Sequence, residues 1–242
     1  MNTGTAHAKD RLRQRIWDLL DGNRVGRSGP VHGEIPDFHG ADRAAARLAE
    51  HPRWVEAPVV KANPDRAQAE VRRHALESGK LLYTAVPGIA APEPFHEIDP
   101  AALPASPAVL ATGRGAALHA PRTPLDRMRP VDVVVCGSVA VNRQGVRIGK
   151  GAGYSDIEMA LLAQAGLIGE RTLVVTTVHT LQLIDEPVPA AEHDVGVDLV
   201  VTPDEIVECP PGRRPSGIDW QVLDEEKISA IPVLEALRRD LR

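Results

Sequence analysis

The sequence predicts an α/β protein with a doubly wound, mostly parallel sheet and helices on both faces. Strand-like and helix-like segments alternate along the 242 residues, which favours parallel strands joined by helical crossovers. Residues 131–142 are almost entirely apolar, as a strand buried on both faces of a parallel sheet is, and residues 171–178 (RTLVVTTV) predict another buried strand. The 43% hydrophobic content suits one large domain or two small ones. Because no clean linker interrupts the pattern, we expect a single Rossmann-like domain over residues 1–242.

The first third of the chain contains three expected helices and two expected strands. Leu12, Ile16, Leu19 and Leu20 recur at helical spacing, and Gly22 ends that helix. Valines precede a turn at residues 63–64 in the first strand, and Pro87 stops the second. In chain order, we expect a helix at 8–22, a helix at 41–51, a strand and turn at 57–65, a helix at 66–79 and a strand at 80–86.

Residues 87–130 are rich in proline and alanine and have weak periodicity. We expect this segment to be an irregular, partly ordered excursion over one face, where substrate-binding segments often lie. Regular patterning then resumes. We expect a strand at 131–142, a helix at 155–166, a strand at 171–178 and a strand with a turn at 196–209.

Composition excludes several classes of protein. The net charge of −5 comes from mixed acids and bases, so we expect no nucleic-acid partner. No apolar run reaches the length of a membrane helix and the N-terminus resembles no secretory signal, so we expect a cytoplasmic protein without a membrane partner. Cys136 and Cys209 lie far apart, and the nine histidines form no ligand motif, which disfavours a transition-metal site. A monomer and a homodimer are both compatible with the sequence.

The segment GVRIGKGAGYSD at residues 145–156 is the strongest candidate site. It follows a buried strand and precedes a helix, which is where ligands bind in doubly wound folds. Its glycines allow backbone N–H groups to converge on an anion. Arg147 and Lys150 offer charge for phosphates, and Asp156 offers a ligand for magnesium. The alternative interpretation of the segment alone is a tight turn with solvated charges.

Three motifs resemble the 5-formyltetrahydrofolate cyclo-ligase family. RIGKGAGYSD at 147–156 is similar to the family signature R-[LI]-G-x-G-x-G-Y-[YF]-D. KDRLR at 9–13 is similar to its N-terminal K-x-x-[LI]-R, and HDVGVDLVVT at 193–202 to a later H-D-x-x-[VL]-D segment. The motifs occur in the family's order. Further segments look like the divergent branch of methenyltetrahydrofolate synthetase domain-containing proteins, although no aromatic stretch typical of RNA recognition is present.

The resemblance implies a cyclo-ligase type of fold and an ATP- and Mg²⁺-dependent ring closure that yields 5,10-methenyltetrahydrofolate. It implies catalytic roles for Arg147, Lys150 and Tyr154, and magnesium ligation by Asp156 and Asp194. It implies nucleotide contacts by Lys9, Arg13, Gly149, Gly151, Ala152, Gly153, Tyr154 and Gln182. Taken singly, Lys9 and Arg13 are also typical of an exposed helix face, and Asp194 of a turn cap.

Two features depart from the family pattern. Ser155 stands where the signature has a second aromatic residue. The glutamate that typical members use for folate has no clear equivalent; Asp65, Gln68 and Glu70 occupy that region instead. Two alternatives therefore stay open: an ATP-dependent ligase that activates another amide or carboxylate, and a nucleotide-binding module without catalysis. For either enzyme we expect a small-molecule carbonyl substrate.

Overall fold

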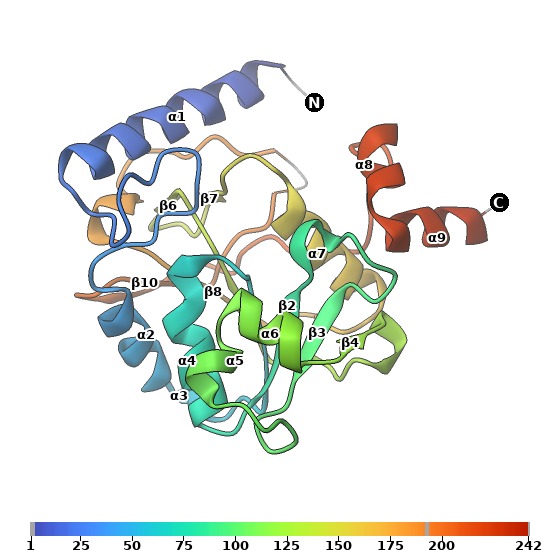
Figure 1. The fold of residues 1–242 in the computed structure, drawn as a ribbon. Helices are drawn as coiled ribbons and strands as arrows, with labels where there is room; N and C mark the ends of the chain where they lie inside the picture. Colours follow the sequence, from blue (N-terminus) through green and yellow to red (C-terminus); the bar gives the residue numbers. More distant parts are fainter. Residues whose placement is uncertain (1–2, 192–193, 242) are drawn as a thin grey trace.

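A central sheet dominates the protein, which we describe from a computed structural model covering residues 3–191 and 194–241 (Figure 1). Its strand order is β11-β10-β8-β5-β1-β2-β3-β4. The five strands from β10 to β2 are parallel, and β11, β3 and β4 add antiparallel edges. The strands are β1 (Val59–Ala62), β2 (Leu81–Ala85), β3 (Phe95–Ile98), β4 (Arg122–Thr123), β5 (Val133–Cys136), β8 (Leu173–Thr177), β10 (Leu199–Val201) and β11 (Ile206–Glu208). The predicted mostly parallel sheet is confirmed.

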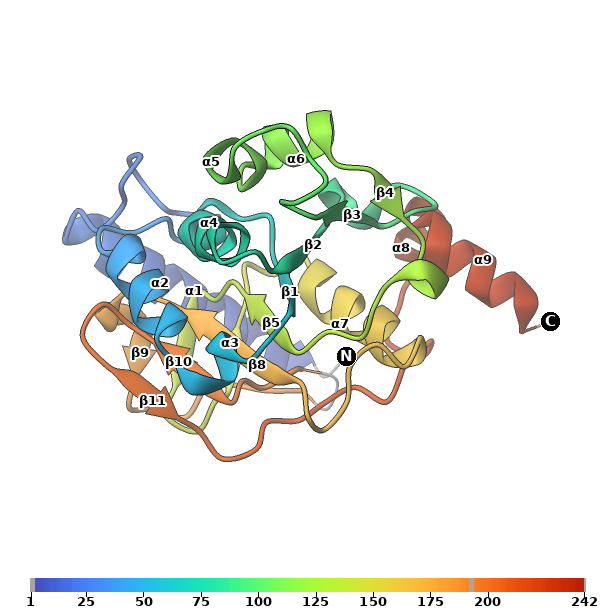
Figure 2. The ribbon, with the colours of Figure 1, turned by 90° about the horizontal axis from the view of Figure 1, so that it is seen from below.

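Helices cover both faces of the sheet, as the sequence predicts (Figure 2). The helices α2 and α4 pack on one face and α7 on the other. The helices are α1 (Thr3–Gly22), α2 (Ala41–Ala49), α3 (Pro52–Val55), α4 (Ala69–Glu77), α5 (Pro107–Leu110), α6 (Gly113–His119), α7 (Tyr154–Gln164), α8 (Glu225–Ala230) and α9 (Pro232–Asp240). Short 3₁₀ turns are η1 (Arg66–Gln68), η2 (Pro87–Ile89), η3 (Leu125–Arg127) and η4 (Thr180–Gln182).

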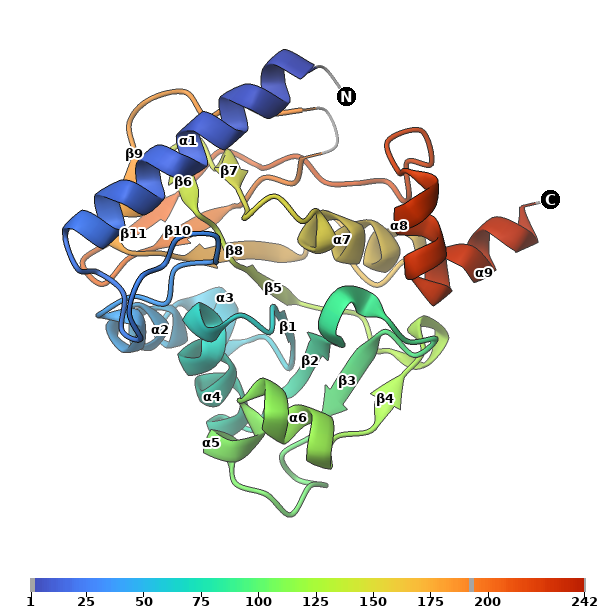
Figure 3. The ribbon, with the colours of Figure 1, turned by 45° about the horizontal axis from the view of Figure 1, so that its top comes forward.

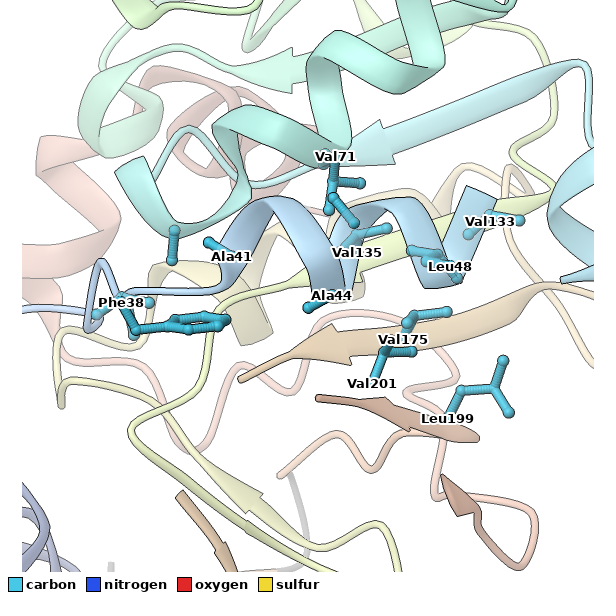
Figure 4. Packing of buried hydrophobic residues seen from close by; sticks show 14 of the residues in the cluster. Phe38, Ala41, Ala44, Leu48, Val71, Val133, Val135, Val175, Leu199 and Val201 are labelled. Atoms are coloured by element: carbon cyan, nitrogen blue, oxygen red, sulfur yellow. The ribbon is translucent and has the colours of Figure 1, made fainter. Parts of the chain in front are cut away.

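Alternating valines divide the core between the two faces. Val133 and Val135 on β5 point toward α2 and α4, whereas Val134 points toward α7. Figure 4 shows Ala44 and Leu48 of α2 lying over the strands. The small side chains of α2 bring that helix close to the sheet, and Leu48 then fills the remaining space at full burial.

Replacing Leu48 by alanine is expected to lower the free energy of unfolding by about 2–5 kcal/mol, because the cavity would be enclosed by the sheet. Urea denaturation measures the change. Leu118→Ala is the matched control, since Leu118 on α6 is 72% exposed and its truncation is expected to cost less than about 0.5 kcal/mol. Equal costs for the two variants would contradict this packing.

The predicted strand at residues 131–142 is wrong as a single element. It ends as β5 at Cys136, and the chain then enters a smaller sheet, β7-β6-β9, formed by β6 (Ala140–Asn142), β7 (Arg147–Ile148) and β9 (Leu183–Ile184). Gly137 marks the exit, because a Cβ there would lie 2.7 Å from the Ile35 side chain. Because the residues after Cys136 remain mostly apolar, the sequence gives no signal for the end of β5.

Residues 87–130 are more regular than the sequence predicts. They contribute β3 and β4 to the sheet edge and place α5 and α6 beside α4 (Figure 2). Phe95 and Ile98 on β3 are fully buried. The strands are too short, and too closely flanked by prolines, to produce a clear period in the sequence.

His96 on β3 predicts a pH-dependent stability. Its imidazole is buried opposite Thr84, and Nδ1 has no hydrogen-bond partner among the described residues. Burial lowers the pKa of His96, Arg122 acts in the same direction, and the backbone of Ala120 opposes both. The folded state therefore favours the neutral ring. This contribution is present above the unfolded pKa of about 6.5 and is lost as the pH falls through the lower folded value.

We expect the wild-type melting temperature to fall more than that of His96→Phe when the pH is lowered from well above to well below about 6.5. Thermal melts of both proteins across this range measure the difference. Phenylalanine is chosen because its ring keeps the buried volume nearly unchanged. Melting temperatures that fall equally with pH in both proteins would contradict the role of His96.

The C-terminal helices, which the sequence does not reveal, pack on the outer side of α7. Ile157 and Leu161 of α7 form a separate apolar cluster with Ile228, Ile231 and Leu234. Figure 3 shows α8 beside α7, with α1 crossing above the β6 and β7 region.

Candidate functional site

The glycine-rich loop connects β7 to α7 and spans residues 149–153. Gly151 and Gly153 have φ angles of 105° and 75°, which side chains with a Cβ rarely adopt. Gly153 is also the N-cap of α7, so the loop directs the first backbone N–H groups of that helix outward. The two glycines therefore allow the tight turn between β7 and α7, and anion binding by this turn stays a prediction.

The loop lies at the carboxyl ends of β1 and β5. Arg147 NH1 donates to the carbonyl of Gly137, directly after β5, at 3.0 Å. Asn63, directly after β1, donates to the Ser155 hydroxyl at 3.3 Å. This edge is where doubly wound sheets bind ligands.

The N-terminal helix brings Lys9 and Arg13 to this edge. Residues four apart share one face of a helix, and the Lys9 and Arg13 side chains contact Asp194 and the glycine-rich loop. Arg13 Nε donates to the carbonyl of Gly149 at 2.8 Å, and its guanidinium lies against Gly151. Lys9 Nζ donates to Asp194 Oδ1 at 2.6 Å. The structure thus brings the first and last motifs together around the loop.

Arg147 is almost enclosed. Its NH2 group contacts the Ser155 hydroxyl at 3.3 Å and Asp156 Oδ1 at 3.1 Å. Burial works against the charge of Arg147, but Cys136, Asp156, Asp194 and Glu158 outweigh it and raise the pKa of the guanidinium. In this arrangement Arg147 holds the start of α7 and Asp156 in place.

Lys150 is more accessible to solvent than Arg147, and it contacts a different acid. Its Nζ donates to Glu34 Oε2 at 2.8 Å. Burial acts to lower the pKa of Lys150, while the hydrogen bond to Glu34 and the charge of Asp65 act to raise it, and the net pKa is raised. Lys150 is therefore a cation throughout the neutral range, at a position that solvent reaches.

Tyr154 and Ala152 meet a residue that the sequence analysis did not identify. Lys227 of α8 donates from Nζ to the carbonyl of Ala152 at 2.5 Å and lies 4.7 Å from the centre of the Tyr154 ring. The Tyr154 hydroxyl lies 3.8 Å from the place of a Cβ on Gly88. No motif surrounds Lys227, so only the fold reveals its position.

Asp156 and Asp194 are the expected metal ligands. Each carboxylate already pairs with a cation, Asp156 with Arg147 and Asp194 with Lys9. Both acids act on the charge of Arg147 and help to raise its pKa. Within the described residues no group of three or more His, Cys, Asp or Glu side chains could hold a metal. Two carboxylates suit Mg²⁺ that also binds phosphate and water. His193 lies outside the described residues.

Gln182 does not present its amide to the loop. Its Nε2 donates to the carbonyls of Ser138 and Val139 at 2.8 and 3.1 Å, and its Oε1 accepts from the backbone N–H of His179. The side chain is buried, and these bonds use its amide to fix the turn between β5 and β6. The side chain therefore has a structural role, because the backbone leaving β5 needs these donors, and its nucleotide contact stays a prediction.

The sequence profile of the 5-formyltetrahydrofolate cyclo-ligase family matches residues 5–203. The chain belongs to this family. It is 37% identical over 244 aligned positions to the methenyltetrahydrofolate synthase domain-containing protein of Mus musculus, covering 98% of this chain and 65% of that protein. The protein of the same name from Bos taurus is 37% identical over 237 positions, covering 96% and 62%. The chain thus spans less than two thirds of these relatives.

A solved structure shares the cyclo-ligase family fold. The NMR structure of Aquifex aeolicus 5,10-methenyltetrahydrofolate synthetase aligns with a TM-score of 0.52 at 19% identity, covering 86% of this chain and 94% of that one. The shared architecture confirms the predicted cyclo-ligase type of fold. Among the described residues, no helix has the length and apolar character needed to cross a membrane.

A buried ion pair lies beneath the cyclo-ligase signature. Lys61 of β1 contacts Glu158 of α7 and donates to Asn63 Oδ1 at 2.6 Å. Burial raises the pKa of Glu158, and Lys61 opposes that rise. A lysine inside an apolar strand was a usable signal in the sequence, but its partner 97 residues away was not.

Ser155, which departs from the cyclo-ligase signature, connects this pair to the site. Its hydroxyl lies within hydrogen-bond distance of both Asn63 and Arg147. Polar bridging therefore takes the place of a second aromatic ring. Of the three residues found where the family has its folate-contacting glutamate, Asp65 faces the site, with its Oδ2 3.2 Å from the place of a Cβ on Gly137.

The other two residues are turned away from the loop. Gln68 is buried and contacts Thr177 at 3.4 Å. Glu70 pairs with Arg73 and Arg27. Asp65 is therefore the acidic side chain of this region that approaches Gly137 and acts on the charge of Lys150.

Proposed function

We propose that the chain is an ATP- and Mg²⁺-dependent cyclo-ligase that converts 5-formyltetrahydrofolate to 5,10-methenyltetrahydrofolate. The observation that carries the proposal is the convergence of Lys9 and Arg13 with the glycine-rich loop at the carboxyl end of the parallel sheet. Membership of the cyclo-ligase family supports the reaction type.

The proposed reaction proceeds in two steps. The formyl oxygen takes the terminal phosphoryl group of ATP and releases ADP. The neighbouring folate nitrogen then attacks the activated formyl carbon, the C–O bond breaks, phosphate leaves, and the nitrogen loses its proton. Phosphoryl transfer depends on positioning and charge neutralisation more than on covalent help from the protein. A bound Mg²⁺ would neutralise phosphate charge.

The residues of this site fit those needs. The N–H groups at the start of α7 and the loop form an anion cradle, and Arg13 closes one side of it. Lys150 holds Glu34 only in a largely exposed ion pair, which contributes about 0–1 kcal/mol. A phosphate oxygen can therefore replace Glu34 at low cost. Asp156 and Asp194 would hold the magnesium ion, with Arg147 orienting Asp156.

A second candidate is a ligase of the same fold that activates a different amide or carboxylate. Ser155 and Asn63 make the wall beside the signature polar, and Asp65 lies close to Gly137 in a chain that has no clear equivalent of the family's glutamate. These features change the substrate side and leave the phosphate side intact. A cytoplasmic location and the single-domain organisation remain part of the proposal.

The test is incubation with ATP, Mg²⁺ and 5-formyltetrahydrofolate while methenyl absorbance and ADP are followed. Formation of both products in equal amounts is the expected result. ADP release that depends on another carbonyl compound, without methenyl product, would select the second candidate. Tight ATP binding without any turnover would leave a nucleotide-binding module and contradict both enzymes.

A further inference from the structure

The C-terminal helices form a mount for one side chain above the glycine-rich loop. They lie beyond residue 203, where the family match ends. Ile228, Ile231 and Leu234 are buried against α7, which holds α8 beside that helix (Figures 2 and 3). Asp224 caps α8 by accepting from the backbone N–H of Lys227 at 2.6 Å. The position of Lys227 is therefore determined by packing and by the cap.

The Lys227 ammonium makes three contacts with the loop and the first residue of α7. It donates to the carbonyl of Ala152 at 2.5 Å and lies over the Tyr154 ring at 4.7 Å from its centre. It is also 3.9 Å from the place of a Cβ on Gly153, the N-cap of α7. An ammonium has three N–H donors, so the bond to Ala152 leaves two for another acceptor.

Charge pairing separates Lys227 from the other cations of the site. Each of the others contacts a carboxylate, in the pairs Lys9–Asp194, Arg13–Asp10, Arg147–Asp156 and Lys150–Glu34. Within residues 3–191 and 194–241, no carboxylate pairs with Lys227. Its ammonium lies beside the N-terminus of α7, which carries positive partial charge. Because no described carboxylate pairs with Lys227, a bound anion would supply its countercharge.

We propose that Lys227 binds a phosphate group of the nucleotide, so that α8 and α9 are a functional part of the site. The inference rests on the proposed function, since the nucleotide enters through it. The backbone N–H groups of the loop bind the phosphates, and the Lys227 ammonium contacts them from α8. Lys227 is thus a binding residue contributed by a segment outside the family match.

The test compares nucleotide affinities by isothermal titration calorimetry in the full chain. Lys227→Met is expected to weaken ATP binding about tenfold, equal to about 1.4 kcal/mol, and to weaken AMP binding less. Lys227→Arg is expected to retain most of the affinity. Because salt screens charge–charge attraction, the affinity of Lys227→Met for ATP is expected to depend less on salt than that of the wild type. Arg238→Gln is the matched control, since Arg238 of α9 pairs with Glu225 of α8.

Three outcomes distinguish the inference from the proposed function. Wild-type affinity in Lys227→Met would overturn the inference alone. So would equal losses for ATP and AMP with a lower melting temperature and unchanged salt dependence, because they would indicate that Lys227 only supports the loop. A wild-type protein that binds no ATP would overturn the proposed function and the inference with it.

Discussion

Lys61→Met is expected to lower the free energy of unfolding by about 3–5 kcal/mol. Lys61 is fully buried on β1, and its partner Glu158 is nearly as buried on α7. Removing the ammonium leaves the buried Glu158 carboxylate without its ion-pair partner, and Asn63 loses a hydrogen bond at 2.6 Å. Such a carboxylate either stays charged at high cost or takes up a proton. Urea denaturation at neutral pH measures the loss.

Two controls make this result specific to the ion pair. The double variant Lys61→Met/Glu158→Leu is expected to recover most of the stability, because apolar replacement of a whole buried pair is often neutral. Lys80→Met removes another buried lysine, whose Nζ donates to the carbonyls of Val55 and Ala57. Its cost is expected to be about 1–3 kcal/mol, the penalty for unsatisfied buried acceptors. A loss of stability below about 1 kcal/mol in Lys61→Met would contradict this prediction, because it would show that the buried Glu158 does not need the charge of Lys61.

The buried pair also matters for the site, because it continues into it. Asn63 accepts from Lys61 and donates to Ser155, and Arg147 contacts the same hydroxyl. The start of α7 is therefore attached to β1 through polar side chains, in addition to the apolar contacts below it. We infer that Ser155 suits this chain because an aromatic ring there would break the connection between Asn63 and Arg147.

The parallel sheet was predictable because its strands are short valine-rich segments between clear helix signals. The exit of the chain at Gly137 was not, since the apolar letters continue into β6. Ile35 approaches the chain closely at Gly137, a tertiary contact that no local pattern encodes. The edge strands β3 and β4 were missed for the same reason, because pairing with β2 and burial of Phe95, rather than local propensity, hold them in place.

The candidate site divides in the same way. The juxtaposition of Arg13 with Gly149, 136 residues apart, followed from family motifs and from no physical pattern. Gln182 has the residue type that such a motif suggests, but its amide is used by the backbone of the turn after β5. Lys227 and Glu158 gave no signal, because an isolated charge becomes informative only once its neighbours are known. Sequence reasoning therefore located the loop, and the fold supplied the residues that support it.

Lys150→Ala is expected to lower kcat of the proposed ligase by about 10- to 1,000-fold while stability stays nearly unchanged. The ammonium is charged at neutral pH, since Glu34 and Asp65 together overcome the effect of burial on its pKa. A charge held beside the transferred phosphoryl group acts most strongly when negative charge develops there. The ion pair with Glu34 is largely exposed, so its loss costs at most about 1 kcal/mol of stability. Steady-state ADP release at saturating ATP and thermal melts measure the two effects.

Arg143→Ala is the matched control, because Arg143 also forms an exposed ion pair, with Glu205 at 2.9 Å, on the turn between β6 and β7. It is expected to keep the wild-type rate. Asp156→Asn is expected to raise the Mg²⁺ concentration needed for half-maximal rate, since one of two candidate carboxylates is neutralised. An active enzyme in which Lys150→Ala and Asp156→Asn both keep wild-type kinetics would place the chemistry elsewhere. The cationic edge of the loop would then serve α7 and its neighbours, because Arg147 and Lys9 already neutralise the two acids without any ligand.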